Sequence, residues 1–115
     1  MNKSILSVHD LNKKEILNIL NLSKSLKKQR YNNKLKNKNI ALIFQKPSTR
    51  TRVSFEVGIN QLGGNSIVLN WNDLQLGREE TVEDTVKVLE RYCDAIIARV
   101  YSHEDLVKMN NVSKI

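Results

Sequence analysis

Three hydroxyl side chains and two arginines occupy five consecutive positions in this sequence: Ser48, Thr49, Arg50, Thr51 and Arg52. They follow an unbroken apolar run, residues 40–44, that predicts a strand buried on both faces, and Pro47 lies between the two segments. A helix that begins directly after a strand leaves several backbone N–H groups without intrahelical partners, and the positive end of its dipole lies at the same place. Hydroxyl and guanidinium groups add further donors. The segment therefore predicts a binding site for an anion such as phosphate.

The same five residues also have a simpler interpretation, which is a helix N-cap followed by two arginines on the surface. The local charge argues against it, because residues 1–52 carry 13 lysines and arginines but only two acids, Asp10 and Glu15. Few carboxylates are therefore near enough in the sequence to pair with the arginines. We favour the anion site and keep the surface N-cap as its alternative.

Two further positions could contribute to the same chemistry. Arg99 comes directly after residues 95–98, an apolar run that predicts a short strand, so this arginine is expected at the carboxyl end of that strand. It could equally be a surface arginine whose stem lies on apolar neighbours. Gln75 lies in a polar stretch, residues 71–80, that could reach a ligand or a neighbouring subunit.

The sequence around these positions alternates between helical and strand patterns. Apolar periodicity predicts helices over about 13–26, 48–62, 81–93 and 102–110, and continuous apolar runs predict strands over 40–44, 66–70 and 95–98. Asn12 and Glu15 form a capping box for the first helix, and Gly63-Gly64 supplies a left-handed end for the second. This order predicts an α/β fold, a parallel sheet with helices on both faces. Ligands bind such sheets at the carboxyl ends of the strands, where the 48–52 turn and Arg99 are both expected.

Composition narrows the class of protein. The net charge is +7 over 115 residues, yet the lysines of the first half are mixed with asparagines and have no interleaved aromatic residues. We therefore favour a solvated basic surface over a nucleic-acid-binding patch. No apolar run approaches the roughly 18 residues of a membrane span. The single cysteine, Cys93, suits a reducing compartment as a buried structural thiol. We expect no nucleic acid partner, no membrane and a cytoplasmic location.

Residues 44–56, F-Q-K-P-S-T-R-T-R-V-S-F-E, closely resemble the carbamoyl-phosphate signature of the aspartate/ornithine carbamoyltransferases. The likeness continues through residues 62–64 and through D-A-I-I-A-R-V at 94–100, and it covers nearly the whole chain. The stretch L-Q-L-G-R-E-E at 74–80 looks like the ornithine type of loop, with Glu79 in place of the usual glycine. That difference costs little where φ is negative and more where φ is positive.

The resemblance implies a carbamoyl-phosphate-binding domain over residues 1–115 and a role for each residue of the turn. The residues that would bind carbamoyl phosphate are Ser48, Thr49, Arg50, Thr51, Gln75 and Arg99. Gln75 would act in the site of an adjacent subunit, and Arg99 would contact the carbamoyl group. Arg50, Thr51 and Arg99 would be the catalytic residues. The implied reaction is attack of the δ-amine of L-ornithine on the carbamoyl carbon, which gives citrulline and phosphate. The implied enzyme is a homotrimer of arginine metabolism that needs no metal and no organic cofactor.

The family motifs that would bind the amine do not occur within the 115 residues. We therefore expect an incomplete, N-terminal portion of a longer carbamoyltransferase, inactive by itself and without the second, ornithine-binding domain. Other carbamoyl acceptors stay open, namely putrescine, acetylornithine or aspartate. A non-catalytic anion-binding fragment is an alternative from a different class.

Overall fold

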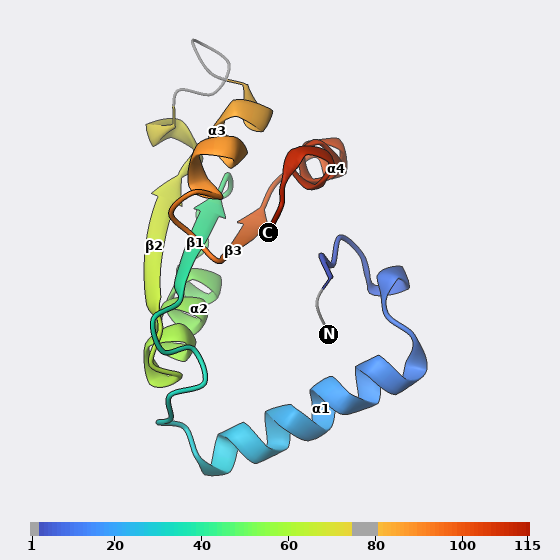
Figure 1. Ribbon diagram of the computed structural model, residues 1–115, viewed down its shortest axis with the longest axis vertical. Helices are drawn as coiled ribbons and strands as arrows, with labels where there is room; N and C mark the ends of the chain where they lie inside the picture. The colour runs from blue at the N-terminus through green and yellow to red at the C-terminus, as the bar shows by residue number, and fades with distance from the viewer. Residues whose placement is uncertain (1–2, 75–80) are drawn as a thin grey trace.

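Strand β1 (Asn39–Phe44) forms the centre of a three-stranded parallel sheet, with β2 (Asn65–Asn70) on one side and β3 (Ala95–Arg99) on the other (Figure 1). The computed structural model describes residues 3–74 and 81–115. Its helices are α1 (Lys13–Lys28), α2 (Thr49–Gln61), α3 (Val82–Leu89) and α4 (His103–Val112), with 3₁₀ turns η1 (Val8–Asp10) and η2 (Trp71–Asp73). Every predicted helix and strand is present in the predicted order, so the α/β architecture is confirmed.

The third helix was predicted to run to residue 93, whereas α3 ends at Leu89. The hydrogen bonds that follow it change from a four-residue to a three-residue spacing, since the N–H of Arg91 donates to the carbonyl oxygen of Val88 at 3.2 Å and that of Tyr92 to the carbonyl oxygen of Leu89 at 3.0 Å. The N–H of Asp94 then pairs with the carbonyl oxygen of Asn39 at 2.8 Å. The chain thus leaves the helix over residues 90–93 and pairs with β1 from Asp94 onward.

The hydrophobic core lies on both faces of β1, whose residues 40–44 are at most 6% exposed. Because side chains alternate along a strand, successive residues of β1 enter different clusters. The buried members of the two clusters are Ile40, Leu42, Phe44 and Ile59, and Ile43, Val86 and Met109. Helix α2 therefore covers one face of the sheet, and α3 and α4 cover the other. This confirms the prediction, made from the unbroken apolar run, that the strand is buried on both faces.

The apolar side chains of α2 are only partly covered. Ile59 is buried, whereas Val53 and Val57 are about half exposed and Phe55 is 38% exposed. The described sheet has three strands, which gives α2 only a narrow surface to rest on. The helix is therefore held mainly near Ile59, and its first turn remains accessible.

Gly63 ends α2 in the predicted left-handed conformation, with φ of +82°. A Cβ atom at this position would lie 3.0 Å from the carbonyl oxygen of Asn32, so both the backbone conformation and the limited space disfavour a side chain. Gly58 lies inside the same helix and has no positive φ. No atom lies within 4 Å of the place its Cβ would take, so a side chain has room there.

We predict that Gly63→Ala lowers the free energy of unfolding by about 1–2 kcal/mol, because alanine is strained in the left-handed region. Gly58→Ala is the matched control, and it should leave the free energy of unfolding unchanged or raise it by up to about 1 kcal/mol. Urea unfolding followed by circular dichroism measures both. Equal effects of the two substitutions would contradict the role given to Gly63.

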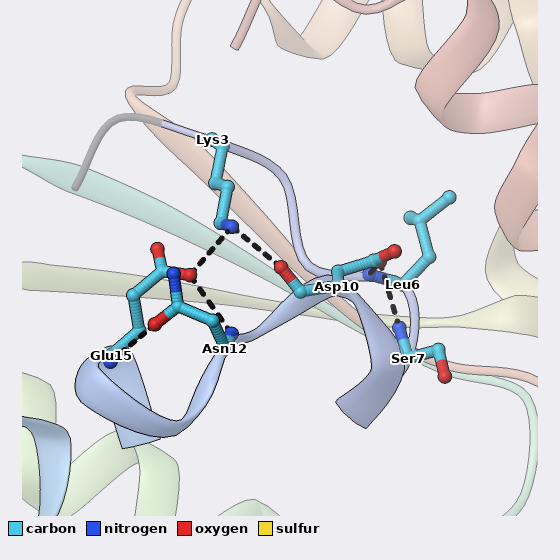
Figure 2. Close-up of polar contacts among 6 residues, drawn as sticks. All are labelled: Lys3, Leu6, Ser7, Asp10, Asn12 and Glu15. Atoms are coloured by element: carbon cyan, nitrogen blue, oxygen red, sulfur yellow. Dashed lines mark hydrogen bonds and ion pairs between the residues drawn. The ribbon is translucent and has the colours of Figure 1, made fainter. Parts of the chain in front are cut away.

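Polar contacts tie the N-terminal segment to the first turn of α1 (Figure 2). Asn12 Oδ1 accepts from the N–H of Glu15 at 2.8 Å, and Glu15 Oε1 accepts from the N–H of Asn12 at 3.0 Å, which confirms the predicted capping box. Lys3 Nζ pairs with the same Glu15 oxygen at 3.0 Å. The hydrogen bond from the Asn12 backbone, and then the contact with Lys3, lower the pKa of Glu15 from its ordinary value. No residue of α1 is buried, and Figure 1 shows the helix projecting from the sheet, so these caps matter for its stability.

Because the pKa of Glu15 is lowered on folding, the stability it contributes is present above the ordinary pKa of 4.5 and is lost as the pH falls through the lower folded value. We predict that the amide proton of Asn12, followed by NMR, titrates with a midpoint below 4.5. In Glu15→Gln, which keeps the cap acceptor but does not ionise, the same resonance should stay flat. A wild-type midpoint at or above 4.5 would contradict this assignment.

Candidate anion-binding site

The turn that follows β1 lies at the carboxyl edge of the sheet, between Phe44 and the start of α2 at Thr49. Ser48 is the N-cap residue, with φ of −154° and ψ of 99°, but its side chain makes no capping hydrogen bond. Its hydroxyl donates instead to Thr51 Oγ1 at 2.9 Å. The N–H groups of the first turn are therefore not taken up by the N-cap side chain, which is the arrangement that an anion site requires.

Helix α2 differs from the other helices in the charge of its first turn. Acids complement the dipole at the start of α1, α3 and α4: Glu15, Glu83, Asp84, Glu104 and Asp105. The first turn of α2 contains no acid and carries Arg50 and Arg52 instead. Positive charge at the positive end of a helix is unfavourable by itself, and a bound anion removes that repulsion.

Strand β3 brings Arg99 to the same edge. The register pairs Phe44 with Arg99, so the arginine stands beside the residue from which the turn departs. Arg99 Nη1 donates to Thr51 Oγ1 at 2.8 Å, across 48 residues of sequence. Thr51 Oγ1 thus accepts from both Arg99 and Ser48, which uses its two lone pairs and leaves its own proton to be donated. The two strand ends meet, as the predicted topology required.

The remaining residues of the turn differ in what they contact. Thr49 and Arg50 are exposed, and Arg50 takes part in none of the ion pairs found in residues 3–74 and 81–115. Arg52 Nε, in contrast, donates to Glu56 Oε1 at 2.7 Å. The expectation that acids lie too far away to pair with the arginines is therefore wrong for Arg52, because four residues on a helix bring two side chains together. Arg50 is exposed and has no such partner among the residues that the structure describes.

Gln75 lies outside the described residues, as does Glu79, so both predictions about the 75–80 loop stay predictions. Gln45 was missed in the sequence. Its N–H donates to the carbonyl oxygen of Arg99 at 2.9 Å, and its Oε1 accepts from the N–H of Tyr101 at 2.8 Å. The available signal was its place, a neutral polar residue directly after five buried ones.

Cys93 is buried at the amino end of β3, the opposite edge from the turn, as expected of a structural thiol. Burial, and then the charge of Asp94, raise the pKa of this thiol, which keeps it protonated and unreactive. Among the described residues, no three His, Cys, Asp or Glu side chains gather closely enough to hold a metal ion. Within the same ranges, none of the helices has the length and apolar character that crossing a membrane requires.

Comparison with known proteins gives a consistent result. The family model described as aspartate/ornithine carbamoyltransferase, carbamoyl-P binding domain, matches residues 3–115. Ornithine carbamoyltransferase of Campylobacter fetus is 50% identical over 117 aligned positions, which cover 98% of this chain and 38% of that protein. The solved ornithine carbamoyltransferase of Pyrococcus furiosus superposes with a TM-score of 0.92 at 45% identity, over 98% of this chain and 37% of that one.

A variant of N-acetyl-L-ornithine transcarbamylase, solved with carbamyl phosphate and N-succinyl-L-norvaline, is less similar. It has a TM-score of 0.85 and 30% identity, over 98% of this chain and 41% of that one. The chain thus spans less than half the length of each of these relatives. Since the family model matches nearly every residue, the chain belongs to the aspartate/ornithine carbamoyltransferase family, within its carbamoyl-phosphate-binding domain.

Proposed function

We propose that residues 48–51 and Arg99 bind carbamoyl phosphate, and that the chain supplies this half of the active site of an ornithine carbamoyltransferase. The observation that carries the proposal is the 2.8 Å hydrogen bond from Arg99 Nη1 to Thr51 Oγ1, which joins the end of β3 to the open start of α2. Membership of the family supports the choice of carbamoyl phosphate over other phosphates.

The positions of the hydrogen-bond donors suggest which part of carbamoyl phosphate each residue binds. Thr49 and Arg50, with the backbone N–H groups of the first turn, hold the phosphate, and Ser48 joins them when its hydroxyl turns from Thr51 Oγ1 to the ligand. Thr51 and Arg99 donate to the carbonyl oxygen of the carbamoyl group, and Arg50 bridges that oxygen and the departing phosphate. Their existing hydrogen bond keeps Thr51 and Arg99 together before the ligand arrives, so less ordering is needed on binding.

The proposed reaction needs only charge stabilisation and proton transfer. The δ-amine of ornithine forms a C–N bond to the carbamoyl carbon, the bond from that carbon to the phosphate oxygen breaks, and phosphate leaves with the electron pair. The amine nitrogen loses one proton, which the departing phosphate takes up, and citrulline and hydrogen phosphate result. Negative charge grows on the carbonyl oxygen and on the phosphate, and fixed donors aimed at both oxygens lower the barrier.

The rest of the enzyme is also part of the proposal. Relatives named ornithine carbamoyltransferase are 50% and 46% identical to this chain but are more than twice as long, so the ornithine site is assigned to the part of such a protein that this chain does not cover. We propose a cytoplasmic homotrimer in which Gln75 reaches the site of an adjacent subunit. The lower identity of the acetylornithine enzyme, 30%, makes acetylornithine the second candidate acceptor.

We predict that Arg50→Ala weakens binding of carbamoyl phosphate about 10- to 100-fold, because a charged hydrogen-bond donor to the phosphate is lost. Arg52→Ala is the matched control. It removes the same charge two residues further along the helix, from a side chain that is already paired with Glu56. The affinity of this variant for carbamoyl phosphate should fall less than about threefold. Isothermal titration calorimetry on the 115-residue chain measures both.

Equal losses in the two variants would show that the anion senses only the net charge of the helix, and would contradict the assignment of Arg50. Binding without turnover after addition of the remaining part of a full-length relative would favour a non-catalytic anion-binding protein. In a complete enzyme, Arg50→Ala should remove about 3–4 kcal/mol of transition-state stabilisation.

A further inference from the structure

Gln45 is the first residue after β1, and it makes one hydrogen bond to each of the two residues that flank Val100. Its backbone N–H donates to the carbonyl oxygen of Arg99 at 2.9 Å, which extends the pairing of β1 with β3 by one step. Its side-chain Oε1 accepts from the N–H of Tyr101 at 2.8 Å. One residue therefore holds the chain both at Arg99 and two residues beyond it.

These two hydrogen bonds hold the chain at the point where its pairing with β1 ends. The paired residues of β1 and β3 end at Phe44 and Arg99, and residues 100–102 then cross to α4, which begins at His103. Tyr101 is 68% exposed, so its side chain offers little anchorage to that crossing. The side chain of Gln45, which is half-buried, supplies the anchorage from the strand that leads into the turn.

The consequence concerns the guanidinium of Arg99. It reaches Thr51 Oγ1 at 2.8 Å, and hydrogen bonds weaken steeply when distance or angle departs from the favoured range. Thr51 is placed by α2, whereas Arg99 is the last residue of its strand, so the contact depends on how firmly that strand end is held. Gln45 is bonded to the backbone at the end of β3 and lies three residues before Ser48, so it connects that strand end to the segment that leads into α2.

We propose that Gln45 is a positioning residue, which fixes the backbone on both sides of Val100 and thereby holds the Arg99 guanidinium against Thr51 in the anion site. It does not touch the ligand. The proposal rests on the function proposed above as far as the ligand is concerned, but the positioning of Arg99 can be tested without any ligand.

The test compares two substitutions of nearly equal size. Gln45→Met keeps the length of the side chain and the backbone bond to Arg99, but has no oxygen to accept from Tyr101. Gln45→Glu keeps such an oxygen. We expect Gln45→Met to weaken carbamoyl phosphate binding about fivefold in calorimetry. Gln45→Glu places a negative charge near the proposed anion site, so it serves as the control for the ligand-free measurement below. Urea unfolding of each variant gives its free energy of unfolding, so that the affinities are compared under conditions in which every variant is folded.

A double-mutant cycle separates positioning from a general effect on the fold. In the Arg99→Ala background, Gln45→Met should cause no further loss of affinity, because the residue it positions is gone. A loss of the same size in both backgrounds would overturn the proposal. So would a Gln45→Met variant that binds carbamoyl phosphate as the wild type does.

A ligand-free measurement keeps the two proposals distinguishable. The Nε–Hε resonance of Arg99 and the amide resonance of Tyr101, observed by NMR without anion, should both shift in Gln45→Met and stay near their wild-type positions in Gln45→Glu. If these shifts occur while the wild type binds no carbamoyl phosphate, the proposed function fails and the positioning role stands. An Arg99 resonance unchanged in Gln45→Met would overturn the positioning role.

Discussion

Strand β1 pairs with β3 in a register that sets Phe44 opposite Arg99, and the rest of the candidate site depends on this pairing. At the amino end the pairing begins with reciprocal bonds, in which the N–H of Asn39 donates to Asp94 Oδ2 at 2.9 Å and the N–H of Asp94 to the carbonyl oxygen of Asn39 at 2.8 Å. At the carboxyl end, the N–H of Gln45 continues the pairing by donating to the carbonyl oxygen of Arg99 at 2.9 Å. A shift by one residue would turn Arg99 to the other face of the sheet, away from the turn.

The second constraint is the open start of α2. A helix start normally gains stability from an N-cap side chain and from acids in its first turn. Ser48 instead turns its hydroxyl to Thr51, and arginines stand where the other helices have acids. The fold therefore keeps a local arrangement that is unfavourable without an anion. A functional site can thus lower the stability of its own segment while the rest of the fold compensates for it.

Local patterns in the sequence were sufficient for the architecture. The unbroken apolar run 40–44 predicted a strand buried on both faces, Gly63 predicted the helix end, and the capping box at Asn12 predicted the start of α1. These features depend on neighbouring residues only, so they can be recognised before the chain is folded. The edge at which the turn and Arg99 meet followed from the α/β order as well.

Contacts between distant residues could not be predicted in the same way. The bond from Arg99 to Thr51 depends on strand register and on the direction of α2, and neither is encoded within a short segment. The role of Gln45 depends on the same register. The pair of Arg52 with Glu56 is different, because its four-residue spacing was visible in the sequence and was overlooked.

Mapping of NMR shifts can show whether carbamoyl phosphate binds at the start of α2 beside Arg99. Carbamoyl phosphate is titrated into the ¹⁵N-labelled 115-residue chain while the backbone amides and the arginine Nε–Hε groups are observed. We expect saturable shifts concentrated at the amides of residues 49–52 and at the side chains of Arg50 and Arg99. Shifts spread over the lysine-rich residues 24–38, and removed by moderate salt, would contradict this expectation and would assign the binding to the basic surface.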